Sequence, residues 1–486
     1  MATSLSDIPK AFLKGITHSK ISLLGAMVVT VSFPFLLGAA LYDTFLHIAN
    51  PYFSGFLYMI LGPTFIGGLV LVFVGLFFAR GKEEVRLFTL AYFRDKLSDE
   101  TGFSKIRKLV FLGVFLTCVN LFVVGVLAYS GYHYMESNAF CGEVCHVPMT
   151  PEYTAYQNSA HSRVHCVDCH IGSGASWFVK SKISGARQLV AVVANTFARP
   201  IETPVHGLRP ARDTCEQCHR PELFHGDKLV IKDKFREDEN NTHVKTVLLM
   251  KIGSAGDQAA DSHGIHWHVA RENEITYKAA DWERNILPEV SQRADDGSMI
   301  VYRSGNADEQ LESADHLQER TMDCIDCHNR PSHVYLPADE AIDVKIMTRH
   351  IPRDIPYIKQ QAMVAVSVEY KTQDEAREAI AESIRSYYKA NYPDIHSRDW
   401  KKLDQAIAGV QAAYVENVFP EMGIQWETYT NNLGHSGDEM GCFRCHNDEH
   451  ESSSGKVISM DCDTCHTILA EDEENPEILE TLIGEN

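Results

Sequence analysis

The segment Cys166-Val-Asp-Cys-His170 places two cysteines about one helical turn apart and follows them at once with a histidine. Twelve of the thirteen cysteines in the 486-residue chain fall into six groups of this kind: Cys141/Cys145/His146, Cys166/Cys169/His170, Cys215/Cys218/His219, Cys324/Cys327/His328, Cys442/Cys445/His446 and Cys462/Cys465/His466. This pattern is the attachment signature of c-type haem, because the two thiols can reach the two vinyl groups of one porphyrin and the adjacent histidine can bind its iron. The sequence therefore predicts six covalently bound haem c groups, each with its motif histidine as an axial ligand.

Zinc ribbons and disulfides are the main alternatives for paired cysteines. Histidine makes up 23 of the 486 residues, so six unrelated cysteine pairs would all be followed by one with odds on the order of 10⁻⁸. Iron–sulfur clusters are disfavoured because no closely spaced run of cysteines ends in Cys-Pro. The first motif differs from the others by having three residues between its cysteines, which leaves a disulfide or a free thiol pair open there.

Six further axial ligands are needed if every iron is six-coordinate, and 17 histidines lie outside the motifs. The favoured ligands lie near a motif or in a histidine-poor stretch: His161, His225, His243, His333, His435 and His450. One histidine of the run His263-Gly-Ile-His266-Trp-His268 is also expected to bind iron, with His266 as the working choice and the other two left open. Alternation would put His266 and His268 on one face of a strand. Irons with two protein ligands have no free position, which favours electron relay over the binding of a small substrate.

Three charge-free apolar runs, residues 21–41, 57–79 and 109–129, are each long enough to cross a bilayer as a helix. Basic residues precede the first run and fill the loop between the second and third, whereas residues 43–56 contain no Lys or Arg. The positive-inside rule then places the N-terminus in the cytoplasm and everything after about residue 131 on the opposite side. Buried core helices are the alternative interpretation of these runs.

The charge is distributed unevenly along the chain. Residues 1–135 contain 11 Lys/Arg and 7 Asp/Glu, whereas the remainder contains 34 against 58. An acidic body argues against nucleic acid as a partner and favours a basic redox partner whose docking weakens with salt.

Regular structure is expected in a few segments of the acidic body. Residues 244–252 are typical of a short strand, and residues 372–392 and 400–419 have the apolar spacing of helices that end before Pro393 and Pro420. The predicted fold class is a membrane-anchored, mainly α protein. In it, three transmembrane helices precede a haem-packed multihaem cytochrome c domain with little regular secondary structure.

Several segments resemble the NapC/NirT family of membrane-anchored, quinol-oxidising multihaem cytochromes. They are Phe140-Cys-Gly-Glu-Val-Cys-His-Val-Pro-Met149, Pro151-Glu-Tyr153, Ser159-Ala-His161, the second motif and Cys215-Glu-Gln-Cys-His-Arg-Pro-Glu222. The three apolar runs and the extra motifs depart from the short members, which have one span and four haems. They look more like the larger inner-membrane cytochromes that feed periplasmic carriers. The resemblance implies three parts: an anchor (residues 1–130), a NapC/NirT-like trihaem module (131–225) and a C-terminal trihaem extension (226–486).

The resemblance also implies a function, which is to oxidise menaquinol and pass its electrons through the haems to periplasmic acceptors in anaerobic respiration. The haem domain would face the periplasm from the bacterial inner membrane. Partners would be the quinol pool and soluble periplasmic cytochromes or reductase subunits, with a homo-oligomer left open. The alternatives are a terminal reductase for nitrite or a similar substrate with an open haem, and an electron-relay subunit of a larger respiratory complex.

Candidate site residues follow from the same resemblance. Relatives use a methionine just after the first motif as an iron ligand, which points to Met149 beside His146. The family's quinol-pocket lysine matches Lys180 or Lys182 in position, although residues 171–201 lack the accompanying acidic residue. Glu143, Glu136 or His133 would then accept the quinol protons. The alternative role for the two lysines is snorkelling at the membrane surface from an amphipathic helix over residues 177–197.

Overall fold

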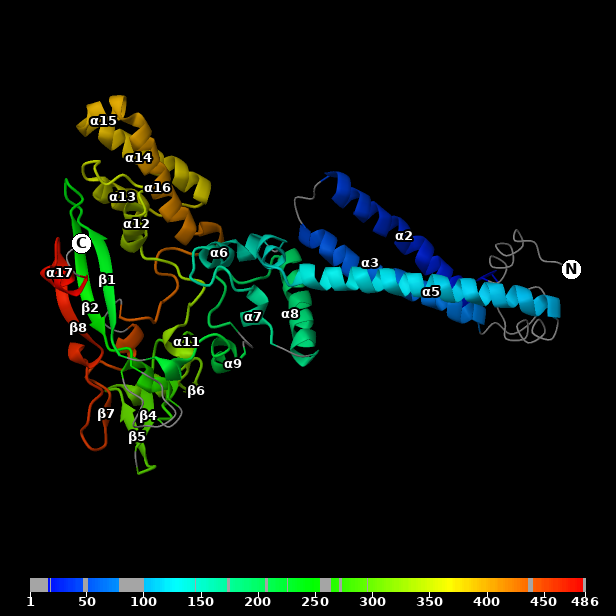
Figure 1. The fold of residues 1–486 in the computed structure, drawn as a ribbon, viewed down its shortest axis with the longest axis horizontal. Helices are drawn as coiled ribbons and strands as arrows, with labels where there is room; N and C mark the ends of the chain where they lie inside the picture. Colours follow the sequence, from blue (N-terminus) through cyan, green and yellow to red (C-terminus); the bar gives the residue numbers. More distant parts are fainter. Residues whose placement is uncertain are drawn as a thin grey trace. The chain divides into compact units, whose positions relative to one another are not determined.

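A computed structural model describes residues 16–17, 19–46, 51–77, 100–144, 146–172, 175–205, 209–224, 226–253, 264–270, 273–294, 296–435 and 440–483 (Figure 1). The chain divides into two compact units. The first comprises Met1–His146 with Ala175–Phe197, and the second comprises Val147–Gly174 with Ala198–Asn486. Most of the basic flanks on which the predicted membrane orientation rests lie outside the described residues.

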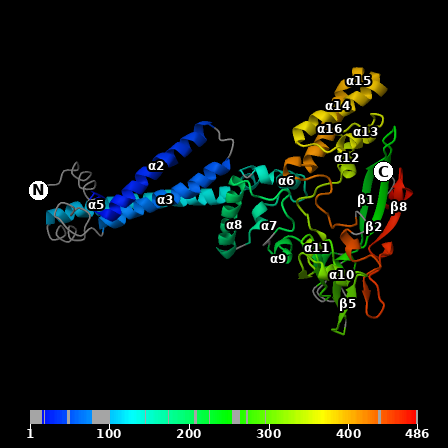
Figure 2. The same ribbon diagram turned by 180° about the vertical axis from the view of Figure 1, so that it is seen from behind.

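Helices α2 (Lys20–Leu46) and α3 (Pro51–Phe77) of the first unit lie side by side in both views (Figures 1 and 2). Their close approach depends on small residues, because a Cβ atom added to Gly25 would lie only 2.6 Å from the carbonyl oxygen of Gly68. The Ser22 hydroxyl also donates a hydrogen bond of 3.0 Å to the carbonyl oxygen of Val72. Small residues and a hydroxyl at the contact are typical of helix pairs in membranes, where apolar burial alone does not drive association.

Two helical segments in the described part are long and apolar enough to cross a membrane, namely Lys20–Ala39 and Tyr58–Leu76. The third predicted span lies within α5 (Glu100–Met135), a helix of 36 residues in which the apolar segment Val114–Val123 is shorter. The first unit also contains the π-helical turn η2 (Phe140–Val144) and α8 (Ala175–Val193), which contacts α3. Helix α8 confirms that the segment after the second motif is helical.

The second unit begins with short elements around the motifs. They are α6 (His146–Gln157), α7 (Cys166–His170), α9 (Ala211–Cys215), η3 (Pro221–Leu223) and η4 (Ile265–Val269), followed by α10 (Ala307–Glu312) and α11 (Cys324–Cys327). Near the C-terminus lie η5 (Pro420–Met422), η6 (Gly441–Arg444), η7 (Cys462–Thr464) and α17 (Glu477–Ile483).

A layer of helices supplies the main hydrophobic core of the second unit. It consists of α12 (Ala338–Met347), α13 (Ile358–Val366), α14 (Gln373–Asn391), α15 (Pro393–Arg398) and α16 (Trp400–Asn417). Thr372 caps α14 by accepting a hydrogen bond from the backbone N–H of Glu375, and Tyr388 and Tyr414 are completely buried between the helices. The helices predicted from residues 372–392 and 400–419 are therefore confirmed.

Two antiparallel sheets complete the second unit. One has the strand order β1 (Lys228–Phe235), β2 (His243–Met250), β8 (His466–Glu473), and Figure 2 shows these strands side by side. The other has the order β6 (Gln318–Thr321), β3 (Thr276–Ala279), β4 (Glu289–Arg293), β5 (Met299–Arg303), β7 (Glu451–Ser452). Strand β2 confirms the strand predicted over residues 244–252. In the first sheet the motif histidine His466 begins β8 and pairs with Met250 at the end of the central strand β2, so this sheet holds the last motif in place.

Two predictions of local structure are wrong. The haem-binding part has more regular secondary structure than predicted, with two antiparallel sheets beside its helices, because the long segments between motifs build cores of their own. His266 and His268 lie on the 3₁₀-helix η4 rather than on a strand. Gly264 precedes this turn with φ of +65°, a conformation that strains other residues, and a Cβ there would collide with the backbone of Lys251.

Candidate functional site

The six cysteine motifs are called sites 1 to 6 in chain order. Both cysteines of sites 2 and 4 lie on single helical turns, α7 and α11. In sites 5 and 6 the first cysteine lies on η6 or η7 and the second directly follows it, and α9 ends at Cys215 of site 3. In site 4 the Asp323 carboxylate accepts a hydrogen bond from the Ile325 N–H, and Asp326 accepts one from the Asp323 N–H. These turns separate two thiols by the short distance that attachment to one porphyrin requires. Site 1 lies on the wider π-helical turn η2, which matches its extra residue.

The motif cysteines in the described part of the chain form neither a disulfide nor a zinc site. None of the eleven that are described forms a disulfide, and Cys145 lies outside the described residues. No group of three or more His, Cys, Asp or Glu side chains there is arranged to hold a metal ion. Burial raises the pKa of Cys327 to about 12 and that of Cys445 to about 11, which disfavours the thiolate form that zinc requires.

Four motif histidines face a second histidine from a distant part of the sequence. The ring centres lie 6.1 Å apart for His170 and His333 at site 2, and 6.0 Å for His219 and His161 at site 3. The corresponding separations are 5.7 Å for His446 and His268 at site 5, and 6.1 Å for His466 and His435 at site 6. A metal held about 2.0 Å from each ring nitrogen would place the ring centres about 6 Å apart. The spacing of these pairs therefore fits a ligand on each side of a haem iron.

At site 4 an electrostatic interaction, rather than a ring separation, indicates a second histidine. His328 interacts electrostatically with His266, and the charge of His328 adds to burial in lowering the pKa of His266. At site 5 the Nε2 atoms of His446 and His268 are 3.5 Å apart. His266 thus interacts with the motif histidine of site 4 and His268 lies against that of site 5, whereas the sequence favoured a single ligand in this run.

The protonation of these histidines suits iron binding. Burial lowers the pKa of His170, His268, His328 and His435, which favours the neutral imidazole that metals bind. Five ring Nδ1 atoms are hydrogen-bonded to backbone carbonyl oxygens: His161 to Pro331, His266 to Ile252, His268 to Ile265, His333 to Glu152 and His446 to Ser459. This arrangement fixes the tautomer and leaves Nε2 free for the metal, as is usual for ligating histidines.

Two favoured ligands lie elsewhere. His450 is buried and uses both ring nitrogens, with Nδ1 bonded to Asn447 and Nε2 bonded to the Leu287 carbonyl oxygen. His243 Nε2 lies 2.7 Å from an Asp233 carboxylate oxygen, and its ring stacks on Phe235. His450 also interacts electrostatically with the motif histidine His446, but the hydrogen bonds of its two ring nitrogens favour a structural role, as does the ion pair of His243 with Asp233. His225 lies outside the described residues.

Consecutive sites lie next to one another. Cys169 of site 2 interacts electrostatically with Cys218 of site 3. The Cys215 thiol of site 3 donates a hydrogen bond to the Cys324 sulfur of site 4. Interactions of Cys442 with Cys327 and with Cys465 join site 5 to sites 4 and 6. These interactions place each of sites 2 to 5 near the next site in the sequence.

The candidate quinol residues lie on three elements of the first unit. His133 is exposed near the end of α5, with its ring centre 4.3 Å from that of Tyr129. Glu143 is exposed on η2, and Lys180 and Lys182 lie on α8. The Lys180 ammonium lies 4.8 Å from the centre of the Trp177 ring, so this lysine is held by an aromatic neighbour. Met149 is half-buried on α6, and nothing is described of the His146 side chain.

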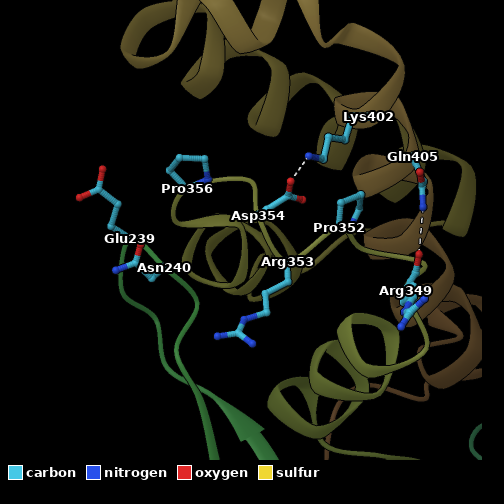
Figure 3. A pocket seen from close by; sticks show the side chains of 9 residues that line it. All are labelled: Glu239, Asn240, Arg349, Pro352, Arg353, Asp354, Pro356, Lys402 and Gln405. Atoms are coloured by element: carbon cyan, nitrogen blue, oxygen red, sulfur yellow. Dashed lines mark hydrogen bonds and ion pairs between the residues drawn. The ribbon is translucent and has the colours of Figure 1, made fainter. Parts of the chain in front are cut away.

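A pocket in the helical layer has a different character from the haem sites. It lies between the β1–β2 turn, the segment that joins α12 to α13, and α16 (Figure 3). Lys402 forms an ion pair with Asp354 there, and the Gln405 side chain donates a hydrogen bond of 2.9 Å to the Arg349 carbonyl oxygen. None of its lining residues is a cysteine or a histidine, so the pocket does not belong to the haem sites.

Comparisons with known proteins agree with these observations. The profile of the NapC/NirT cytochrome c family, N-terminal region, matches residues 104–204. The chain is 36% identical over 467 residues to the cytochrome c-type protein ImcH of Geobacter sulfurreducens, covering 95% of this chain and 90% of that protein. It is 31% identical over 111 residues to the cytochrome c-type protein NrfH of Wolinella succinogenes, covering 22% of this chain and 62% of that protein. No solved structure matches the chain. The chain belongs to the NapC/NirT family of membrane-anchored, multihaem c-type cytochromes.

Proposed function

We propose that this protein oxidises menaquinol at the inner membrane and relays the electrons through six covalently bound haems to periplasmic acceptors. The observation that carries the proposal is the pairing of a second histidine with the motif histidine at sites 2, 3, 5 and 6, together with the interaction of His266 with His328 at site 4. Haem c bound between two histidines takes up and gives away one electron at a time. Two axial ligands leave no position for nitrite or a similar substrate, which argues against a terminal reductase.

The residues that would hold the haems follow from the geometry. The motif cysteines attach them, and the axial pairs are His170 with His333, His219 with His161, His328 with His266, His446 with His268, and His466 with His435. His146 or Met149 would bind at site 1. The trihaem module of residues 131–225 then takes one ligand, His333, from the C-terminal extension. We infer that the module does not assemble site 2 without residues 226–486.

The first unit would provide the membrane anchor and the quinol site. α2, α3 and α5 would be the three spans, with the N-terminus in the cytoplasm and the haem sites in the periplasm. Oxidation of one quinol releases two electrons and two protons. Lys180, Lys182, Glu143 and His133 are the candidates to bind the quinol oxygens and accept the protons. The acidic second unit would attract basic periplasmic cytochromes or reductase subunits, with self-association left open.

Reduction of the purified protein by a menaquinol analogue tests the proposal. We expect rapid haem reduction of the wild type in stopped-flow experiments in detergent. The Lys180→Ala/Lys182→Ala variant should slow it by roughly a hundredfold, the usual scale of general acid–base catalysis. The matched control is Lys232→Ala/Lys234→Ala, which removes two exposed lysines with the same spacing from β1.

The outcomes separate the alternative functions. If the wild type is not reduced by the quinol but is reduced by dithionite, electrons enter from another subunit and the chain is a relay. If both double variants slow reduction equally, the lysines of α8 have no special role at the quinol site. A spectral shift of the wild-type haems with nitrite would support a terminal reductase instead.

A further inference from the structure

The second histidine of site 2 has surroundings that differ from those of the other paired histidines. His333 Nδ1 lies 2.9 Å from the backbone carbonyl oxygen of Glu152, to which it is hydrogen-bonded, and 3.1 Å from the carboxylate oxygen Oε2 of the same residue. The hydrogen bonds given above for His161, His266, His268 and His446 reach only neutral backbone carbonyls. Site 2 therefore has a negative charge against the ring of a ligand histidine.

The Glu152 carboxylate is fixed in this position. Its other oxygen, Oε1, lies 3.3 Å from a guanidinium nitrogen of Arg330, and the side chains of the pair are only 15% and 7% exposed. Arg330 also donates a hydrogen bond of 2.7 Å from Nε to the carbonyl oxygen of His333. The Arg330 guanidinium lies 4.0 Å from the centre of the Tyr429 ring. Glu152, Arg330 and His333 thus form one buried cluster, in which the carboxylate separates the arginine from the imidazole.

The two tyrosines that border the cluster add no charge to it. Burial and the nearby Glu152 raise the pKa of Tyr429 to about 12, and the same two causes raise the pKa of Tyr335 further. Both phenols are therefore neutral at physiological pH. The charges next to His333 in this cluster are those of Glu152 and Arg330, and Oε2 of Glu152 is directed at the ring N–H.

A carboxylate at the N–H of a ligand imidazole increases its electron donation to the metal. Stronger donation stabilises iron(III) more than iron(II), and so lowers the reduction potential. We propose that Glu152 is a positioning residue that makes site 2 the lowest-potential site of the five with described histidine pairs. This inference rests on the proposed pairing of His170 with His333.

A low reduction potential at site 2 would affect electron transfer between site 1 and sites 3 to 6. Site 2 lies between site 1 and the row of sites 3 to 6 in the sequence order of the motifs. An electron that has passed to sites 3 to 6 would have to climb in energy to return through site 2. Glu152 would in this way slow the return of electrons toward site 1. The same barrier lies on the forward step into site 2, so the net direction is set by the potentials of the quinol and of the final acceptor.

The Glu152→Gln variant tests the proposal cleanly, because the backbone carbonyl that fixes the His333 tautomer remains. In potentiometric titrations of the full-length protein followed by EPR, we expect the lowest midpoint potential to rise. The equilibrium constant for that one-electron reduction should change by at least tenfold, which corresponds to 59 mV. The matched control is Glu416→Gln, which breaks a comparable 2.7 Å ion pair, with Lys345, in the helical layer.

The His333→Met variant separates this inference from the proposed ligand pairing. If His333 binds iron, methionine in its place should raise the potential of one haem and remove that haem from the bis-histidine EPR signals. No change would overturn the pairing itself. If His333→Met alters one haem but Glu152→Gln leaves the lowest potential unchanged, or shifts it no more than Glu416→Gln does, the inference about Glu152 is wrong and the pairing stands.

Discussion

Replacement of Cys324 and Cys327 by alanine should give a protein with five haems, of which a menaquinol analogue rapidly reduces only three. The contacts between consecutive motifs place site 4 between site 3 and site 5. Loss of the haem at site 4 would therefore interrupt the only chain of neighbouring sites that these contacts define. Sites 1 to 3 would still receive electrons from the quinol. Stopped-flow absorbance, compared with complete reduction by dithionite, measures the fraction that is reduced.

The matched control is the Cys462→Ala/Cys465→Ala variant. It also lacks one haem, but site 6 lies at the end of the row, next to site 5. All five of its haems should be reduced rapidly by the quinol analogue. Equal reduced fractions in the two variants would contradict the linear order. Haem content per chain must be five in both, so that a failure of haem attachment at neighbouring sites is recognised.

The sequence predicted the attachment sites because each lies within five or six consecutive residues. The second ligands depend on long-range packing, which proximity in sequence does not report. His450 lies four residues after His446 and was favoured for that reason, yet it bonds to the Leu287 carbonyl oxygen. His333 follows site 4 in sequence but faces His170 of site 2. Under the proposed pairing, the triplet His263, His266 and His268 supplies a ligand to each of sites 4 and 5, whereas the sequence predicted only one.

The fold shows the same division between local and long-range information. Helices α14 and α16 were predicted because they are long, have regular apolar spacing and are followed by a proline at Pro393 or Pro420. The five-stranded sheet was missed because its strands are at most five residues long. Strands this short are specified by their neighbours more than by their own propensity. This unpredicted sheet contacts helix α11 of site 4, because Tyr277 on β3 donates a hydrogen bond to Asp326 on α11.

A buried ionic cluster joins this sheet to site 4. Asp326 lies between the two cysteines of the site and is 3% exposed. Its carboxylate lies 3.4 Å from a guanidinium nitrogen of Arg284 and 3.7 Å from that of Arg320, and it accepts a hydrogen bond from the Tyr277 hydroxyl. Burial and the charge of Asp326 raise the pKa of Tyr277, so the phenol stays protonated as the donor. Arg320 is partly exposed and also pairs with Asp323, at 3.3 Å, whereas the buried Arg284 is compensated in this cluster by Asp326.

Substitution of Asp326 by asparagine should destabilise the protein by about 3–5 kcal/mol, because removal of one partner leaves uncompensated buried charge. Asparagine retains the size and an acceptor for Tyr277, so the loss would report the charge rather than a cavity. The control is Asp354→Asn. Asp354 forms an ion pair with Lys402, but its side chain is 71% exposed, so this substitution should destabilise the protein by only about 0–1 kcal/mol. Urea-induced loss of far-UV circular dichroism in detergent compares the two variants, and haem content shows whether site 4 remains occupied. Equal urea midpoints would mean that the Asp326 cluster contributes no more than a surface ion pair, and that the contact between site 4 and the sheet is held by apolar packing instead.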